Sequence, residues 1–166
     1  MTQAQALAQD MQGICIALCE HLRLVPPFSA IELSDRIADE RSCFIYVASR
    51  RLPGTIFGVC ARLRGAYAIL YRADGSMAHQ ERIIFHELGH IVLGHLRQTE
   101  RILVLREGLT STTEEHEAEA FAEFMTTYAL FGTALTSTVK DGTPASTEKD
   151  AGKKSPLGRW MERVTR

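Results

Sequence analysis

The apolar and polar positions at the start of the chain follow a helical period. Residues 2–22 form an amphipathic pattern that ends before Pro26-Pro27, which cannot continue a helix. A second helix is predicted to begin after Ser29, because Ser29 and Glu32 form a capping box. The N-terminal part of the chain is therefore predicted to be two helices joined by a short proline-containing turn.

The period then changes to that of strands. Three short runs rich in β-branched and aromatic residues are predicted strands, at residues 43–47, 55–60 and 67–71. Turn signals separate them, Pro53-Gly54 in the first connection and Arg64-Gly65 in the second. Short strands joined by tight turns predict a small three-stranded antiparallel meander.

A strongly apolar helix follows the strands. Ser76 is its predicted N-cap, and the helix runs to about Gly94 with almost no polar face. Such a helix is buried, and a buried histidine or glutamate costs free energy unless it has a partner. The helix nevertheless contains His86, Glu87 and His90. We therefore expect these three side chains to have a common partner inside the fold.

The run His86-Glu87-Leu88-Gly89-His90 is an H-E-x-x-H sequence. Residues four apart on a helix share a face, so His86 and His90 can each direct a ring nitrogen at one metal ion. Glu87 lies beside them, where a general base can reach the attacking water. This is the arrangement of a zinc peptidase, so we predict that His86 and His90 bind Zn²⁺ and that Glu87 is catalytic. A surface helix with incidental histidines fits the apolar composition poorly.

A catalytic zinc site usually has a third protein ligand. His95 does not fit the metzincin spacing, and we expect it near the helix C-terminus, where the helix dipole favours it. A further helix is predicted from about Thr112 to Leu130. Its first turns contain five acidic residues, which are Glu114, Glu115, Glu117, Glu119 and Glu123. Helical spacing alone does not choose among them.

Composition limits the classes of function. The chain has 166 residues, of which 45% are hydrophobic and 23% charged, and its formal net charge is −1. These values suit one soluble domain, and no basic excess favours direct binding of nucleic acid or of an anionic membrane. No apolar run is long enough to span a membrane and no signal peptide is evident, so we expect a cytoplasmic protein.

The cysteines do not form a recognisable metal-binding pattern. Cys15, Cys19, Cys43 and Cys60 lack the paired spacings of zinc ribbons. Cys15 and Cys19 lie four residues apart and could share a metal, but they stand in an apolar stretch, where free cysteines are commonly buried. In a reducing compartment all four remain thiols.

A sharp change in composition after Phe131 sets the predicted domain boundaries. Residues 1–131 are expected to form the folded domain, and residues 132–154 a flexible linker rich in small and polar residues. Residues 155–166 carry an apolar stripe and are predicted to form a short amphipathic helix. Within the domain, the apolar run at 102–105 is predicted to be a packed strand or a flap beside the cleft.

Two segments of the chain together resemble the ImmA/IrrE family of metallopeptidases. The first is Gln80–His90, and the second is Glu115-His116-Glu117-Ala118-Glu119-Ala120-Phe121-Ala122. The family has H-E-x-x-H followed, roughly 25–30 residues later, by E-A-(N/D)-x-F-A. The order of the predicted elements is also similar, so the resemblance covers about residues 1–130.

The resemblance implies an α+β, zincin-like fold in which the buried H-E-x-x-H helix packs on a second ligand-bearing helix. By position it implies that Glu117 is the third ligand beside the two histidines. It also implies that one Zn²⁺ is bound per chain and that Glu87 is the general base. Glu119 stands where the family has Asn or Asp, and residues 127–130 lack the customary Leu-Leu-x-Pro. The surroundings of the ligands therefore depart from the family pattern.

For function, the resemblance implies a zinc-dependent endopeptidase that cleaves a separate protein, a helix-turn-helix repressor of the Xre type, and so relieves repression. An edge of the sheet could pair with an extended substrate. Tyr71, Tyr128 and Arg82 are candidates for the residue that stabilises the oxyanion. One alternative is a non-catalytic anti-repressor module with a structural zinc, and another is a hydrolase of small amides.

Overall fold

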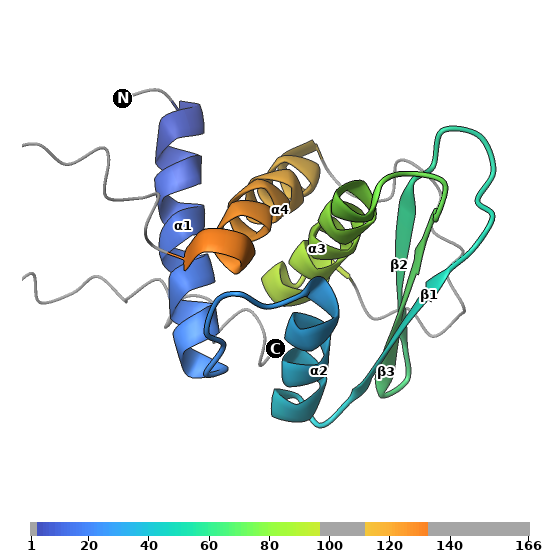
Figure 1. The fold of residues 1–166 in the computed structure, drawn as a ribbon, viewed down its shortest axis with the longest axis horizontal. Helices are drawn as coiled ribbons and strands as arrows, with labels where there is room; N and C mark the ends of the chain where they lie inside the picture. Colours follow the sequence, from blue (N-terminus) through green and yellow to red (C-terminus); the bar gives the residue numbers. More distant parts are fainter. Residues whose placement is uncertain (1–2, 97–111, 133–166) are drawn as a thin grey trace, which may run out of the picture.

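Four helices and three strands make up residues 3–96 and 112–132, the part of the chain that the computed structural model describes (Figure 1). In chain order they are α1 (Gln3–His21), α2 (Ala30–Glu40), β1 (Phe44–Ser49), β2 (Gly58–Leu63), β3 (Ala66–Tyr71), α3 (Met77–Leu93) and α4 (Thr112–Phe131). The fold is α+β, as predicted. None of the described helices is long and apolar enough to cross a membrane.

The predicted C-terminal segments fall almost wholly outside the described residues. Of the predicted linker at 132–154, only Gly132 is described. The predicted helix at 155–166 and the apolar run at 102–105 also lie outside the described residues. The division of the chain after residue 131 therefore stays a prediction.

The helices α2 and α3 begin where their capping residues predict. Ser29 Oγ accepts a hydrogen bond from the Glu32 backbone N–H at 3.1 Å, and Ser76 Oγ accepts one from the His79 backbone N–H at 3.3 Å. Each serine thereby satisfies a backbone donor that has no partner within its own helix. The N-terminus of the H-E-x-x-H helix is therefore confirmed.

The three strands form a mixed sheet, so the predicted antiparallel meander is wrong. The strand order is β1-β3-β2, and the central strand β3 runs parallel to β1 and antiparallel to β2. Ser49 at the end of β1 and Gly58 at the start of β2 both pair with Tyr71. Residues 50–57 therefore pass over the end of β3, a span of roughly 10 Å set by two strand spacings. Pro53-Gly54 lies within this crossing and does not form a tight hairpin turn.

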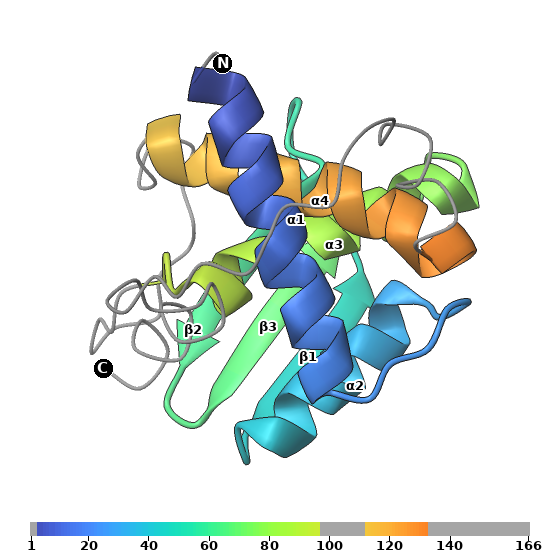
Figure 2. The same ribbon diagram turned by 90° about the vertical axis from the view of Figure 1, so that its left-hand side faces the viewer.

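The helices lie on one face of the sheet in successive layers (Figures 1 and 2). α2 and α3 lie against the sheet, α4 packs on α3, and α1 crosses α4 on the side away from the sheet. Because α3 is covered on both sides, almost its whole circumference is apolar. The fully buried side chains include Phe85, Leu88, Ile91 and Val92 of α3, Phe121 and Met125 of α4, and Cys15, Leu18 and Cys19 of α1. The interpretation of the two α1 cysteines as buried thiols is thus confirmed.

The helices α3 and α4 are in close contact at Gly89. A methyl group on Gly89 would lie 3.2 Å from Phe121 Cδ1 and 3.3 Å from the Ala118 Cα atom. Optimal carbon–carbon contacts are about 3.5–4.0 Å, so a larger side chain at Gly89 would push the helices apart. Small residues on both helices therefore set their separation.

Gly89→Val is expected to lower the free energy of unfolding by about 1–3 kcal/mol, the usual cost of overpacking a core. Urea denaturation followed by circular dichroism measures this value. Ala78→Val, which places the same β-branched residue at an exposed position of α3, is the matched control. It should cost less than about 1 kcal/mol. Equal losses in the two variants would show that the contact at Gly89 does not limit the helix separation.

Candidate metal centre

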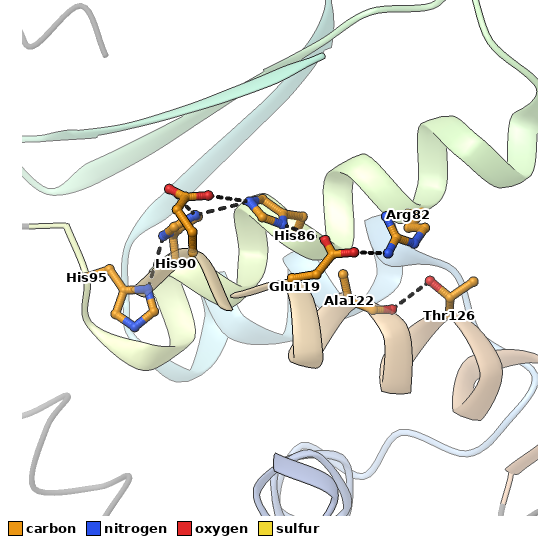
Figure 3. Close-up of polar contacts among 8 residues, drawn as sticks. Arg82, His86, His90, His95, Glu119, Ala122 and Thr126 are labelled. Atoms are coloured by element: carbon orange, nitrogen blue, oxygen red, sulfur yellow. Dashed lines mark hydrogen bonds and ion pairs between the residues drawn. The ribbon is translucent and has the colours of Figure 1, made fainter. Parts of the chain in front are cut away.

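His86 and His90 lie one turn apart on α3, on the side that meets α4 (Figure 3). Their Nε2 atoms are 3.2 Å apart. The His90 side chain is almost fully buried, whereas 23% of the His86 side chain is exposed. The two imidazoles therefore converge, as their spacing in the sequence indicates.

A carboxylate from α4 joins the two imidazoles. Glu115 Oε2 lies 3.4 Å from His86 Nε2, and Glu115 Oε1 lies 3.6 Å from His90 Nε2. Zinc ligands about 2.0–2.1 Å from a tetrahedral centre are roughly 3.3–3.4 Å from one another. The three separations therefore suit one ion, and among the described residues these three side chains form a candidate metal-binding group.

Glu117, the predicted third ligand, lies elsewhere in the structure. Its Oε2 atom is 3.0 Å from His95 Nε2, and it is not part of the group that Glu115 forms with the two histidines. Residues two apart on a helix are separated by about 200° around its axis, so Glu115 and Glu117 cannot point in the same direction. The ligand role of Glu117 stays a prediction, and the geometry adds Glu115 as its competitor.

Glu119, one turn after Glu115, contacts the other ring nitrogen of His86. Its Oε2 atom is 3.4 Å from His86 Nδ1, and the same carboxylate accepts a hydrogen bond from Arg82 (Figure 3). A carboxylate in this position orients a metal-binding imidazole and raises its basicity. The sequence contains the signal for this role, because residues four apart place Glu115 and Glu119 on one face of α4.

The three candidate oxyanion donors occupy different surroundings. Arg82 is paired with a carboxylate of α4. The Tyr128 ring stacks on Phe124 and contacts Phe28, in the core between α4 and α1. Tyr71 ends β3 and is half-buried. The structure therefore does not single out an oxyanion donor among the predicted candidates.

Glu87 is buried beneath β2, with 7% of its surface exposed. Burial, and then the negative charge of Glu115, raise the pKa of Glu87 to about 8. A methyl group on Gly58 would lie 2.5 Å from Glu87 Oε1 and 2.5 Å from Ile83 Cγ2. A side chain at position 58 would therefore displace the Glu87 carboxylate and the Ile83 methyl group, a constraint that the strand pattern of the sequence does not reveal.

The imidazole of His90 is held in its neutral form. Burial, and then the positive charge that His86 can carry, lower the pKa of His90 to about 4. A neutral imidazole has a free ring nitrogen for a metal, whereas a protonated one does not. The buried position of His90 therefore favours the state that binds a cation.

The metal-free protein is expected to lose stability as the pH rises from about 6.5 to 8. In this range folded Glu87 keeps its proton, while an unfolded glutamate, with a pKa near 4.3, has released it. The slope is at most about 1.4 kcal/mol per pH unit. Below about pH 6.5 the lowered pKa of His90 acts in the opposite sense, and stability is lost as the pH falls toward 4.

Urea denaturation of chelator-treated protein at pH 6.5 and pH 8 measures this dependence. Glu87→Gln removes the titrating group and should abolish the loss between the two pH values. Glu123→Gln, at an exposed position of α4, should leave it unchanged. If the free energy of unfolding of the wild type is the same at pH 6.5 and pH 8, the raised pKa of Glu87 is contradicted. It is also contradicted if Glu87→Gln shows the same loss as the wild type.

Comparison with known proteins identifies the family of this chain. Residues 50–149, more than half of the chain, match the family described as the IrrE N-terminal-like domain, peptidase family M78. The matched range contains β2, β3, α3 and α4, and thus all of the side chains that converge here. No curated protein matches the chain significantly. The chain therefore belongs to the ImmA/IrrE family of metallopeptidases.

Proposed function

We propose that this chain is a zinc-dependent endopeptidase that cleaves one particular protein in the cytoplasm. Its family makes it a metallopeptidase, which implies a protein substrate. The observation that carries the proposal is the convergence of His86 Nε2, His90 Nε2 and the Glu115 carboxylate next to the buried Glu87. The proposal thus draws its candidate metal ligands and its candidate base from one stretch of α3 and the facing turn of α4.

The proposed zinc ligands are His86, His90 and Glu115, with one ion per chain. Two imidazoles and one carboxylate are a common donor set for catalytic zinc, and they leave one position open. About half of the Glu115 side chain is exposed, so the site is open to solvent on the α4 side. When bound, zinc supplies Lewis acidity to the scissile carbonyl and to the attacking water.

Glu87 is the proposed general base. Its carboxylate accepts a proton from the attacking water and then donates a proton to the leaving amine. Burial and the charge of Glu115 hold Glu87 protonated near neutral pH. A divalent cation held by His86, His90 and Glu115 would offset this repulsion and would favour the ionised form of Glu87 that a base requires. Glu87 is therefore expected to become a base only when the metal site is filled.

The edge of β2 is the proposed binding site for an extended substrate. Among the described residues β2 pairs only with β3, so its other edge has no strand partner there. Gly58 of β2 lies directly over Glu87. A peptide that added a strand to this edge would run past the base, and its alternating side chains would give specificity.

A separate helix-turn-helix repressor of the Xre type is the proposed substrate. Support comes from the family to which the chain belongs and from its net charge of −1, which gives no reason to expect direct DNA binding. The described helices all pack around one core, with no separate helix-turn-helix module beside it among the described residues. Regulation through a second protein therefore fits this chain better than its own contact with DNA.

The first test is the zinc content of the purified protein after zinc reconstitution and dialysis, which should be about one ion per chain. His90→Ala and Glu115→Gln should lose zinc, whereas Glu117→Gln, which makes the same change two residues away, should retain it. Circular dichroism verifies that each variant is folded. Loss in Glu117→Gln with retention in Glu115→Gln would establish Glu117 as the ligand. Wild-type protein without zinc would refute the metal site.

The second test concerns Glu87→Gln. Cleavage of a candidate Xre-type repressor, followed by gel electrophoresis, should slow by about 10²–10⁴-fold when the base is removed. Zinc content and repressor binding should not change, and Glu123→Gln should cleave at the wild-type rate. If Glu87→Gln still relieves repression fully in a reporter assay, the protein acts instead as a non-catalytic anti-repressor with a structural zinc.

A further inference from the structure

The turn that ends α3 brings His95 against His90. Gly94 has a φ of 76°, in the left-handed region that glycine readily adopts. The Gly94 N–H donates to the Ile91 carbonyl at 3.3 Å, and the His95 N–H donates to the His90 carbonyl at 3.0 Å. These two hydrogen bonds form a Schellman motif, which folds the residue after the glycine back onto the last turn of the helix. The two imidazole rings consequently lie 5.1 Å apart between centroids.

A chain of hydrogen bonds runs from His90 through His95 to Glu117. His90 Nδ1 is 3.0 Å from His95 Nδ1, and His95 Nε2 is 3.0 Å from Glu117 Oε2 (Figure 3 shows the first contact). The exposed fractions of the three side chains are 6%, 5% and 20%. Water therefore has little access to these contacts, so each contributes more than it would at the surface.

The carboxylate at the end of this chain determines the direction of every hydrogen bond in it. A carboxylate only accepts, so His95 Nε2 carries the proton and donates it to Glu117. When this is the only proton on the His95 ring, its Nδ1 has a lone pair and accepts from His90 Nδ1. A neutral His90 with its proton on Nδ1 has a lone pair on Nε2, the atom that faces His86 and Glu115.

We propose that His95 and Glu117 are positioning residues that hold His90 in the tautomer and ring orientation that a metal requires. The inference rests on the proposed metal site. His86 has the Glu119 carboxylate close to its Nδ1, whereas the Nδ1 atom of His90 is linked to the Glu117 carboxylate through the His95 imidazole. On this assignment Glu117 acts through His95 and is not itself a ligand.

Zinc affinity, measured by competition with a chromophoric chelator, tests the inference without reference to activity. His95→Phe keeps an aromatic ring but cannot hydrogen bond, and it should weaken zinc binding about 10–100-fold while one ion is still bound. His79→Phe makes the same change at an exposed position of α3 and should have no effect. Zinc-free unfolding measurements verify that both variants are folded.

Two substitutions at Glu117 separate a hydrogen-bond acceptor for His95 from a metal ligand. Glu117→Gln keeps an amide oxygen that can accept from His95 Nε2, so its zinc affinity should stay close to that of the wild type. Glu117→Ala removes the acceptor and should match the loss in His95→Phe. In long-range ¹H–¹⁵N spectra of the zinc-loaded protein, the His90 Nδ1 proton should exchange slowly in the wild type and rapidly in His95→Phe.

Unchanged zinc affinity in folded His95→Phe would overturn the proposal. Complete loss of zinc in Glu117→Gln would also overturn it. The amide of this variant can still accept a hydrogen bond from His95, so loss of zinc would mean that the Glu117 carboxylate is itself a metal ligand. In that second case the metallopeptidase assignment stands with a different ligand. Absence of zinc from the wild-type protein would instead refute the proposed function, and the inference with it.

Discussion

The site depends on the close contact between α3 and α4 at Gly89. Its donor atoms are divided between the two helices, so the helix separation sets the 3.4 and 3.6 Å distances from Glu115 to the imidazoles. Helices usually pack with their axes 8–10 Å apart, at a distance set by the side chains between them. The absence of a side chain at Gly89, opposite Ala118 and Phe121, lets the carboxylate of α4 approach the histidines of α3. Packing at Gly89 therefore helps to set the distances within the candidate metal-binding group.

The same packing places charged groups where water cannot solvate them. Glu87 and Glu115 repel each other, and burial penalises the ionised form of Glu87 and the protonated form of His90. Glu87 and His90 both lie in the last two turns of α3, so these unfavourable free energies destabilise that end of the helix. Arg41 donates hydrogen bonds there, to the carbonyls of Ile91 at 3.0 Å and of Val92 at 3.4 Å. A cation near the helix C-terminus interacts favourably with the helix dipole and satisfies free carbonyls. Arg41 thus stabilises the end of α3 beside side chains whose charged forms are disfavoured by burial.

The sequence predicts the parts of this arrangement that are local. The caps at Ser29 and Ser76 and the shared face of the two imidazoles follow from neighbouring residues, and the structure contains all three. The choice between Glu115 and Glu117 is not local, because it depends on which face of α4 meets α3, and a contact between distant residues decides that. The order of the strands is also not local. A turn signal indicates that the chain bends, but it does not specify which strand the next segment will join.

The strand order has a consequence for substrate binding. In the predicted antiparallel meander, β2 would be the central strand and both of its edges would be paired. In the observed order β3 is central, so the strand that passes over Glu87 is an edge strand of the part of the sheet that the structure describes. An edge strand has a row of backbone donors and acceptors that another chain can pair with. Residues 50–57, by crossing the end of β3, therefore place beside the buried carboxylate a backbone edge that has no strand partner among the described residues. Glycine at position 58 is what permits them to be so close, since any side chain there would occupy the space of the Glu87 carboxylate.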